Sequence, residues 1–392
     1  MANIKDATLY LWIYTGTLGS KPANPNYVLQ KNVKTGDDVI TFEIAELVKD
    51  YVDVTFTGDY NSITETAWVE WTMVENFDDL TTKTTSDKYI ATNGYGYFKD
   101  GVNPLLKKGA LINNDIIYTI AVSGQGGSSV SADNSVIKVD TTNTTADNSG
   151  GFTLSNIHIP IYTGLDGAYK ADYYEGNALL RTDTFGATIT PITADNAIIT
   201  ADSINFTADM NLSSGTTSNI IVRVSPPKGT DRVVVTNNDS TTETIYIEVI
   251  NECKYTPNKI SFLNQYGVVQ DLWFFKRRND SVNVANSQYL ENTLTASLSS
   301  GVNYSLNSAV NIPHSHTATK SIQMNTGFVD ESYNNVIQEL MLSQRVWIHE
   351  DSNVYPVLPK TKQLNYKTSL NDKLINFTLD FDYAFNEINL VK

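Results

Sequence analysis

Apolar and polar residues alternate along much of the chain, which is the pattern of half-buried β-strands. The clearest example runs from Leu374 to Tyr383. There the odd-numbered residues are apolar, and four polar residues separate them: Ile375, Phe377, Leu379, Phe381 and Tyr383 against Asn376, Thr378, Asp380 and Asp382. We expect this segment to be an antiparallel strand with one buried and one polar face.

Residues 1–166 are expected to form an N-terminal β domain with one helix. A helix is predicted over residues 42–54, because its apolar residues recur at helical spacing: Ile44, Leu47, Val48 and Tyr51. Strands are expected at Thr8–Tyr14, Tyr27–Gln30, Ala67–Val74, Lys88–Ala91, Tyr95–Phe98, Ile116–Val122 and Ile157–Tyr162. Asn93-Gly94 indicates a hairpin between two of them. Residues 123–151, rich in Gly, Ser, Asp, Asn and Thr, are expected to be a flexible insertion or a long hairpin, with one strand at Val136–Val139.

Residues 167–252 are expected to form a β-sandwich-like domain, because short strands recur at roughly ten-residue spacing with turn residues between them. These strands are Tyr169–Tyr174, Ala178–Thr182, Ala187–Thr190, Ile198–Ile204, Asn219–Val224, Arg232–Val235 and Ile245–Ile250.

Residues 253–392 are expected to form a C-terminal β domain. It opens with a hairpin, Ile260–Phe275, that turns at Tyr266-Gly267. A polar stretch over residues 286–311 is expected to be loop-like or to carry weak strands. A helix is predicted over residues 330–343 with Asp330 as its N-cap, and its buried face consists of Tyr333, Val336, Ile337, Leu340 and Met341. Strands are also predicted at Arg345–His349, Tyr355–Leu358 and Thr361–Thr368.

Composition supports this assignment. The chain of 392 residues has 22 tyrosines and only 18% charged residues, and Asn, Ser and Thr recur throughout. Residues of this kind favour strands and turns. We therefore predict a mainly β, multi-domain antiparallel β-sandwich or barrel architecture with two short helices. The lone Cys253 excludes an intrachain disulfide and is expected to be a small buried thiol.

The net charge of −15 argues against specific binding to nucleic acid, which needs basic surfaces. The only basic triplet is Lys276-Arg277-Arg278, interpreted either as a solvated strand end or as a contact for an acidic partner. The preceding Trp273-Phe274-Phe275 is expected to anchor either the core of its own domain or a subunit interface. These six residues are the interface candidates of the sequence.

Candidate chemistry is sparse. His314 and His316 could supply half of a zinc site, but no third ligand lies near them in the sequence, and we interpret them as part of an ordinary polar loop. Asp380 and Asp382 have the spacing of a carboxylate pair, as does any polar strand face. The tyrosines Tyr89, Tyr95, Tyr97, Tyr169, Tyr173 and Tyr174 could form a sugar-stacking platform. No phosphate-loop, dinucleotide or serine-hydrolase motif is present. We therefore expect that the protein is not an enzyme and that it has no catalytic residue, bound metal or cofactor.

Several short sequence segments carry a family resemblance. They are Leu9-Tyr-Leu-Trp-Ile-Tyr14 with Pro25-Asn-Tyr27, Phe42-Glu-Ile-Ala-Glu-Leu-Val, Tyr174-Glu-Gly-Asn, Thr230-Asp-Arg232, Ile245–Glu252 followed by Cys253-Lys-Tyr-Thr-Pro257, Phe262-Leu-Asn-Gln-Tyr-Gly and Asp271-Leu-Trp-Phe-Phe-Lys276. Together they resemble virion proteins of tailed bacteriophages of Bacteroidota hosts, including crAss-like phages. The resemblance spans most of the chain but not residues 123–151, and it includes no catalytic signature.

The resemblance implies a structural role in the virion neck or tail, as a homo-oligomeric ring of about six or twelve copies around the portal–tail axis. Such a ring would dock other portal and tail proteins and would be made in the host cytoplasm. The opening residues lack a signal-peptide pattern, and no run of apolar residues predicts a membrane helix. Two alternatives remain: a carbohydrate-binding adhesin that uses the tyrosines, and a glycan hydrolase that uses Asp380 and Asp382.

Overall fold

The computed structural model describes residues 3–15, 20–33, 39–52, 54–60, 64–95, 98, 118–119, 135–140, 144–146, 152–154, 159–162, 169–185, 221–224, 226–236, 242–250, 252–265, 267–299, 301–329, 331, 333–351, 353–368 and 375–388. These residues are mainly β, with several antiparallel sheets and two α-helices. The predicted fold class, a multi-domain antiparallel β-sandwich architecture with two short helices, is confirmed.

The first lobe is a four-stranded antiparallel sheet of order β2-β1-β3-β4, here called the N-terminal sheet. Its strands are β1 (Ile4–Tyr14), β2 (Tyr27–Asn32), β3 (Thr66–Phe77) and β4 (Thr82–Thr92). The alternation of β1 buries Leu11 and Ile13 on one face, where they pack against Val48 of α1 (Ala45–Lys49). The helix therefore closes one face of this sheet.

The helix predicted over residues 42–54 is shorter than expected. Only Ala45–Lys49 is α-helical. The next turn is tighter, since the N–H groups of Tyr51 and Val52 donate to the carbonyls three residues back, of Val48 and Lys49. Such tight turns are common where a helix ends. The predicted apolar face is nevertheless used, since Ile44, Leu47, Val48 and Tyr51 all pack against the sheet.

The hairpin predicted at Asn93-Gly94 is wrong. Strand β4 pairs with β3, and after it the chain runs against a distant turn, where the Tyr95 N–H donates to the Gln265 carbonyl over 2.8 Å. Tyr95 and Phe98 lie in no strand, while Gly96 and Tyr97 fall outside the described residues.

A five-stranded sheet of order β11-β10-β13-β14-β6 forms the second lobe. Its strands are β6 (Ser135–Asp140), β10 (Tyr169–Glu175), β11 (Ala178–Phe185), β13 (Arg232–Thr236) and β14 (Thr242–Ile250). The strand predicted at Val136–Val139 exists and pairs in parallel with β14, so part of the predicted insertion belongs to this sheet. The division at residues 166 and 252 stays a prediction.

Smaller strands complete this region. A three-stranded sheet has the order β12-β9-β5, and a two-stranded pair joins β7 to β8. Their bounds are β5 (Tyr118–Thr119), β7 (Thr144–Ala146), β8 (Phe152–Leu154), β9 (Ile159–Tyr162) and β12 (Ile221–Val224). The strands predicted at Ala187–Thr190 and Ile198–Ile204 lie outside the described residues.

The third lobe is a seven-stranded sheet of order β16-β15-β21-β22-β23-β20-β17. Its strands are β15 (Asn258–Leu263), β16 (Val269–Phe274), β17 (Asn279–Leu290), β20 (Asn311–Asn325), β21 (Val346–Glu350), β22 (Asn353–Pro359) and β23 (Thr378–Tyr383). Helix α3 (Tyr333–Leu342) covers one face, where its predicted apolar residues join a large buried core.

Several predictions for this lobe are confirmed. Strands β15 and β16 form the expected hairpin, and β23 buries Leu379, Phe381 and Tyr383 on one face. Ile375 and Phe377 extend that face before the strand begins. Asp330, the predicted N-cap, lies outside the described residues.

Two predictions for residues 253–392 are wrong. Cys253 is exposed, because it follows β14 in a bend and not in a strand. Residues 361–368 are not a strand: there the Lys367 N–H donates to the Asn334 side chain on α3. Of the two alternatives for residues 286–311, a loop or weak strands, the strands are confirmed, because the described residues there form part of a long β-ribbon.

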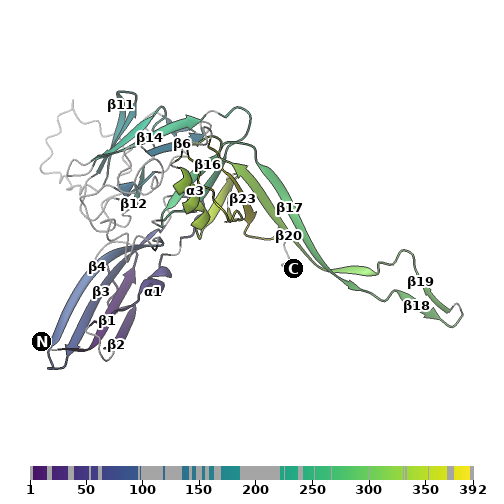
Figure 1. The fold of residues 1–392 in the computed structure, drawn as a ribbon, viewed down its shortest axis with the longest axis horizontal. Coiled ribbons are helices and arrows are strands. Elements are labelled where there is room, and N and C mark those ends of the chain that lie inside the picture. The colour runs from purple at the N-terminus through teal and green to yellow at the C-terminus, as the bar shows by residue number, and fades with distance from the viewer. Residues whose placement is uncertain are drawn as a thin grey trace, which may run out of the picture.

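The three lobes and this ribbon give the molecule a branched shape (Figure 1). The N-terminal sheet points away from the centre on one side, and the ribbon formed by β17 and β20 leaves on the other. Helix α3 and the seven-stranded sheet occupy the centre.

Candidate assembly surface

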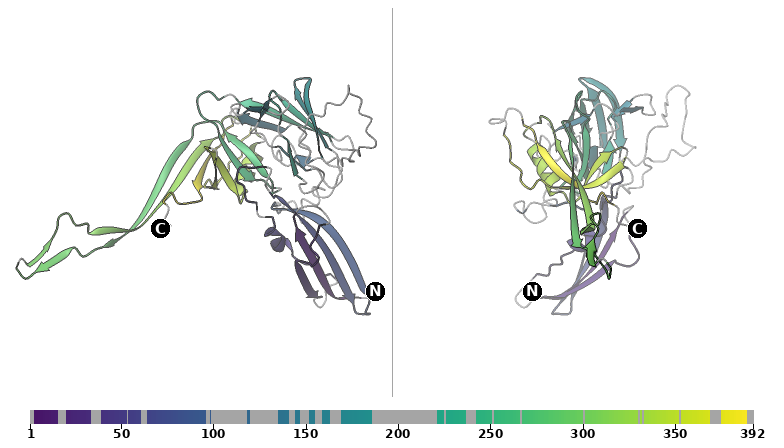
Figure 2. Two further views of the ribbon diagram at one scale, coloured as in Figure 1. Left: turned by 180° about the vertical axis from the view of Figure 1, so that it is seen from behind. Right: turned by 90° about the vertical axis from the view of Figure 1, so that its right-hand side faces the viewer.

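The ribbon is the most exposed part of the described chain. All twelve residues of β17 are exposed, and β17 pairs with β20 from Asn279 opposite Gln323 to Leu290 opposite Asn311. Beyond them, β18 (Leu294–Ser297) pairs with β19 (Gly301–Tyr304) to form the tip. Figure 2 shows the same ribbon from behind, where it leaves the body and carries its tip away from the rest of the coloured chain. Residues 279–320, from the start of β17 to the point where β20 enters the body, are called the arm below.

Large apolar side chains concentrate on the arm. Of the 23 exposed large apolar side chains among the described residues, ten lie between residues 282 and 310. They are Val282, Val284, Tyr289, Leu290, Leu294, Leu298, Val302, Tyr304, Leu306 and Val310. A concentration of exposed apolar side chains in one segment is a feature of interaction sites.

At its base the arm continues the hydrophobic core. Residues directly opposite each other on paired strands share a face, and Val284 lies opposite Ala318 in the β17–β20 register. Two residues further along β20 is Lys320, and then Ile322, which is buried in the core beneath α3. The face that α3 covers in the body therefore runs out onto the arm, where no described residue covers Val282 or Val284.

The outer edge of β17 is also open, since β17 is the last strand of its sheet among the described strands. Natural edge strands are commonly protected from pairing by charged side chains or proline. Strands β2, β4 and β11, which end other sheets, carry Lys31, Lys88 and Arg181 respectively. From Ser281 to Leu290, β17 has neither a charge nor a proline.

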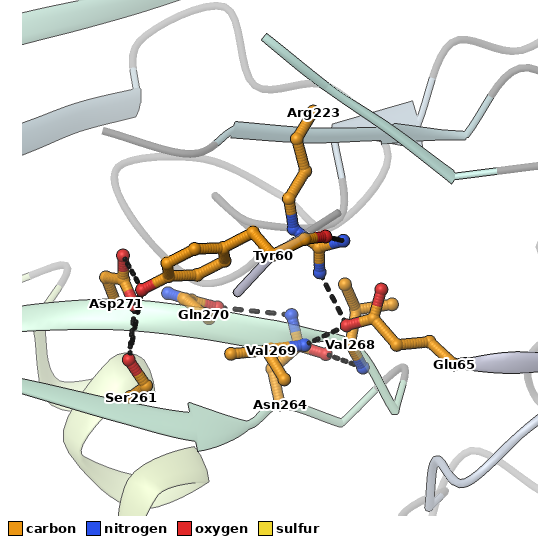
Figure 3. A network of polar contacts seen from close by, with 9 residues as sticks. All are labelled: Tyr60, Glu65, Arg223, Ser261, Asn264, Val268, Val269, Gln270 and Asp271. Carbon is orange, nitrogen blue, oxygen red and sulfur yellow. Dashed lines mark hydrogen bonds and ion pairs between the residues drawn. The ribbon is translucent and has the colours of Figure 1, made fainter. Parts of the chain in front are cut away.

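The second notable feature is a polar junction between lobes, drawn in Figure 3. The face of the seven-stranded sheet opposite α3 is covered by residues 54–60, which follow α1, and Val54, Phe56 and Tyr60 pack there on Leu263 and Trp347. The apolar contact explains why the lobes adhere, and the polar groups beside it fix their register.

Tyr60 is at the centre of this junction. Its hydroxyl donates to both oxygens of Asp271 at 2.8 Å and accepts from the Lys259 ammonium at 3.0 Å. Burial, followed by the negative charge of Asp271, raises the pKa of the Tyr60 phenol well above its usual range. The phenol therefore stays protonated and holds the loop onto the sheet.

Glu65 makes a second connection. Its Oε1 accepts from the Arg223 guanidinium at 2.5 Å and from the Val269 N–H at 2.7 Å. The carboxylate thereby joins the start of β3 to both β12 and β16, and both charged side chains are almost wholly buried. A buried ion pair tolerates the loss of one partner badly, because the other charge is then stranded.

The junction also contains serine, histidine and aspartate. The Ser261 hydroxyl donates to Asp271 at 2.5 Å and lies 2.7 Å from Nε2 of His349. Ser261 is 0% exposed, so a substrate cannot reach its oxygen in this structure. A nucleophile needs both a base and an open approach. We therefore interpret these three side chains as part of the contact that holds the lobes together.

The predicted aromatic anchor lies inside the chain. Trp273, Phe274 and Phe275 are 7%, 0% and 3% exposed. Phe274 packs edge-on against Phe381 in the core beneath α3, while Trp273 and Phe275 stack on each other. A partner would not reach these rings without opening the sheet.

The predicted basic triplet is used mostly within the chain. Lys276 bonds Glu252 at 2.6 Å, which lowers the pKa of that carboxyl, and Arg278 pairs with Asp280 and Glu350. Burial opposes the charge of Arg278, but these two carboxylates outweigh it and raise the guanidinium pKa. Arg277 is exposed. The acidic contact expected of Lys276 and Arg278 is thus supplied by this chain.

The other candidate residues are dispersed. His314 and His316 lie on the arm, where the His314 ring meets Tyr289 edge-on. Within the described ranges no three histidine, cysteine or acidic side chains are grouped to hold a metal. Asp380 accepts from Gln323, and Asp382 accepts from Ser321 and Lys360.

The tyrosines do not form a common platform in the described part of the chain. Tyr173 is fully buried, and the Tyr174 ring lies beneath the Arg232 guanidinium. Nearby, a shallow pocket of about 340 Å³ lies beside the half-exposed Tyr246. Its lining is Gly176, Asp231, Arg232, Tyr246, Ile247 and Glu248.

Sequence reasoning missed the junction, although a signal was present. Lys259, Ser261 and Asp271 are polar residues within two strands that are largely buried. Polar residues at core positions usually meet partners from elsewhere in the fold. Tyr60, Glu65 and Arg223 carry no such local signal, since their partners are far away in sequence.

No family model, curated protein or solved structure matches this chain. Neither helix of the described residues is long and apolar enough to cross a membrane.

Proposed function

We propose that this protein is a structural subunit of a larger assembly, with no catalytic role, and that the assembly is a ring in the neck or tail of a tailed-phage virion. The arm is the observation that carries the assembly role. The neck or tail position rests on the sequence resemblance to virion proteins of phages of Bacteroidota hosts. In this role the subunit docks neighbouring portal or tail proteins.

The arm supports this role because it is an unfavourable structure for an isolated molecule in water. An isolated two-stranded ribbon is at best marginally stable in water. Here the ribbon also exposes ten large apolar side chains and an unprotected edge, both of which invite association. A binding partner that covers the arm removes both liabilities at once.

The polar clusters of the body support the non-catalytic part of the proposal. Tyr60 and Glu65 use their polar atoms to join lobes, through bonds to Asp271 and to the Val269 N–H. A rigid body with a projecting arm is what an assembly subunit requires, since the body sets the geometry of the ring and the arm reaches a neighbour.

Native mass spectrometry and negative-stain microscopy of the purified chain test the proposal. We expect closed particles of about six or twelve copies, because head-to-tail interfaces close into rings. A strict monomer at micromolar concentration contradicts self-assembly.

A carbohydrate-binding adhesin is the second candidate, and the shallow pocket beside Tyr246 is the observation that favours it. An aromatic ring next to Asp231, Arg232 and Glu248 offers the stacking and hydrogen bonding that sugars use. Binding to a panel of host glycans that is lost in Tyr246→Ala supports this candidate. Absence of binding by the wild-type chain rejects it.

A further inference from the structure

The arm is long enough to cross a neighbouring lobe. Twelve residues of β17 at the rise of an extended strand span about 40 Å. A lobe of about 100 residues has a radius of gyration of about 13 Å and is therefore roughly 35 Å across. The tip strands β18 and β19 add further reach. One arm can thus lie along one lobe of another molecule.

The charge of the arm narrows the choice of partner. Between Ser281 and Thr319 the single charged residue is Glu291, although the whole chain has 71 charged residues and a net charge of −15. An arm suited to a basic partner would carry acidic groups, because charge complementarity guides recognition. A nearly neutral arm can instead approach an acidic body without like-charge repulsion. A second copy of this chain, with its net charge of −15, is such an acidic partner.

The reach of the arm also fits two copies that repel each other. Bodies with the same net charge of −15 resist close approach, and this repulsion falls off over roughly 10 Å at physiological salt. An arm of about 40 Å lets a neutral apolar surface make the contact while most of the two bodies stay further apart.

We propose that the arm of one copy docks, through the apolar side chains of its tip, on the body of a neighbouring copy. This rests on the proposed assembly function and adds the surface that makes the contact. The tip is the part of the arm beyond Leu290, where Leu294, Leu298, Val302, Leu306 and Val310 are exposed.

Two variants test the contact in the full chain. Leu306→Asp places a charge on the tip at a side chain that is 90% exposed. The second variant shortens the arm by replacing residues 292–309 with Asn-Gly. That closure is suitable because the Glu291 N–H already bonds the Val310 carbonyl across the ribbon, and Asn-Gly favours a two-residue hairpin turn.

Leu80→Asp is the matched control, since Leu80 is also 90% exposed and lies in the turn between β3 and β4. The two single substitutions make the same change of charge at the same exposure. Circular dichroism and thermal unfolding of each variant establish that the body remains folded.

Mass photometry or light scattering over a range of concentrations gives the dissociation constant between copies. We expect at least a tenfold rise for Leu306→Asp, a monomer for the shortened arm and no change for Leu80→Asp. If the wild-type chain assembles and both arm variants assemble equally well, the docking proposal is wrong while the assembly function stands. If the wild-type chain never assembles, both are wrong.

Discussion

Gly267 faces the backbone of Asn93 so closely that a Cβ atom on Gly267 would lie 2.5 Å from the Asn93 carbonyl carbon. Gly267 closes the turn between β15 and β16, with a φ of +76° that favours glycine. This contact places the end of β4 against the seven-stranded sheet, beside the hydrogen bond from Tyr95 to Gln265.

Gly267→Ala is therefore expected to destabilise the protein by more than about 1 kcal/mol, because it adds backbone strain and a collision with fixed backbone atoms. Gly176→Ala is the control, since Gly176 also has a positive φ, +58°, but a Cβ atom added there would have no described neighbour within 4 Å. Urea unfolding measures both. Equal losses for the two variants would show that only the φ angle matters and that the contact with Asn93 does not.

Glu65→Gln is expected to cost about 3–5 kcal/mol, because it leaves the buried Arg223 without its counter-charge. The control is Glu75→Gln, whose partner Lys83 is largely exposed, and a surface pair of this kind contributes less than about 1 kcal/mol. Denaturant unfolding followed by tryptophan fluorescence gives both values. A loss for Glu65→Gln no larger than that of the control contradicts a role for this pair in joining the lobes.

Tyr60→Phe removes a hydroxyl that donates to Asp271, and we expect a loss of about 1.5–3 kcal/mol at neutral pH. The pKa of Tyr60 is raised in the folded protein, so the folded state holds this proton more tightly than the unfolded state does. The stabilisation by the hydroxyl is complete below the ordinary tyrosine pKa of about 10 and declines as the pH rises above it.

The difference in stability between wild type and Tyr60→Phe should accordingly narrow above about pH 10. Urea unfolding at pH 8 and at several values between about pH 9.5 and 11 provides the measurement. A difference that stays constant across this range contradicts the raised pKa.

Cys253 is expected to react with a thiol reagent in the native protein, because its side chain is exposed after β14. Ellman's reagent should report about one thiol per chain without denaturant, and a Cys253→Ser variant should report none. Reaction only after unfolding would place the thiol inside the protein.

Sequence patterns predicted the elements that depend on local periodicity. The alternation of β23, the apolar face of α3 and the turn at Gly267 each follow from residues a few positions apart. The length of α1 was not predictable in this way, because the chain that follows it leaves the helix to pack Val54, Phe56 and Tyr60 on another lobe.

The arm and the junction needed tertiary information. The arm has a polar composition typical of loops, and its strands are identified only by the pairing of β17 with β20. The junction joins side chains that have no common motif, such as Tyr60 and Asp271, separated by 211 residues. A parallel pair such as β6 and β14 is likewise invisible to local patterns.

The long separation within the junction has a consequence for the order in which the protein forms during synthesis. Glu65 and the Val269 amide are 204 residues apart, so at roughly 5–20 residues per second the ribosome needs about 10–40 s to supply the second after the first. The N-terminal sheet, whose strands end at Thr92, can fold well before that. For this interval Glu65 must remain hydrated, and the apolar surface around Phe56 and Tyr60 is not yet covered by the seven-stranded sheet. The nascent chain therefore passes through a stage in which its first lobe is complete but still lacks the support that gives it a fixed position.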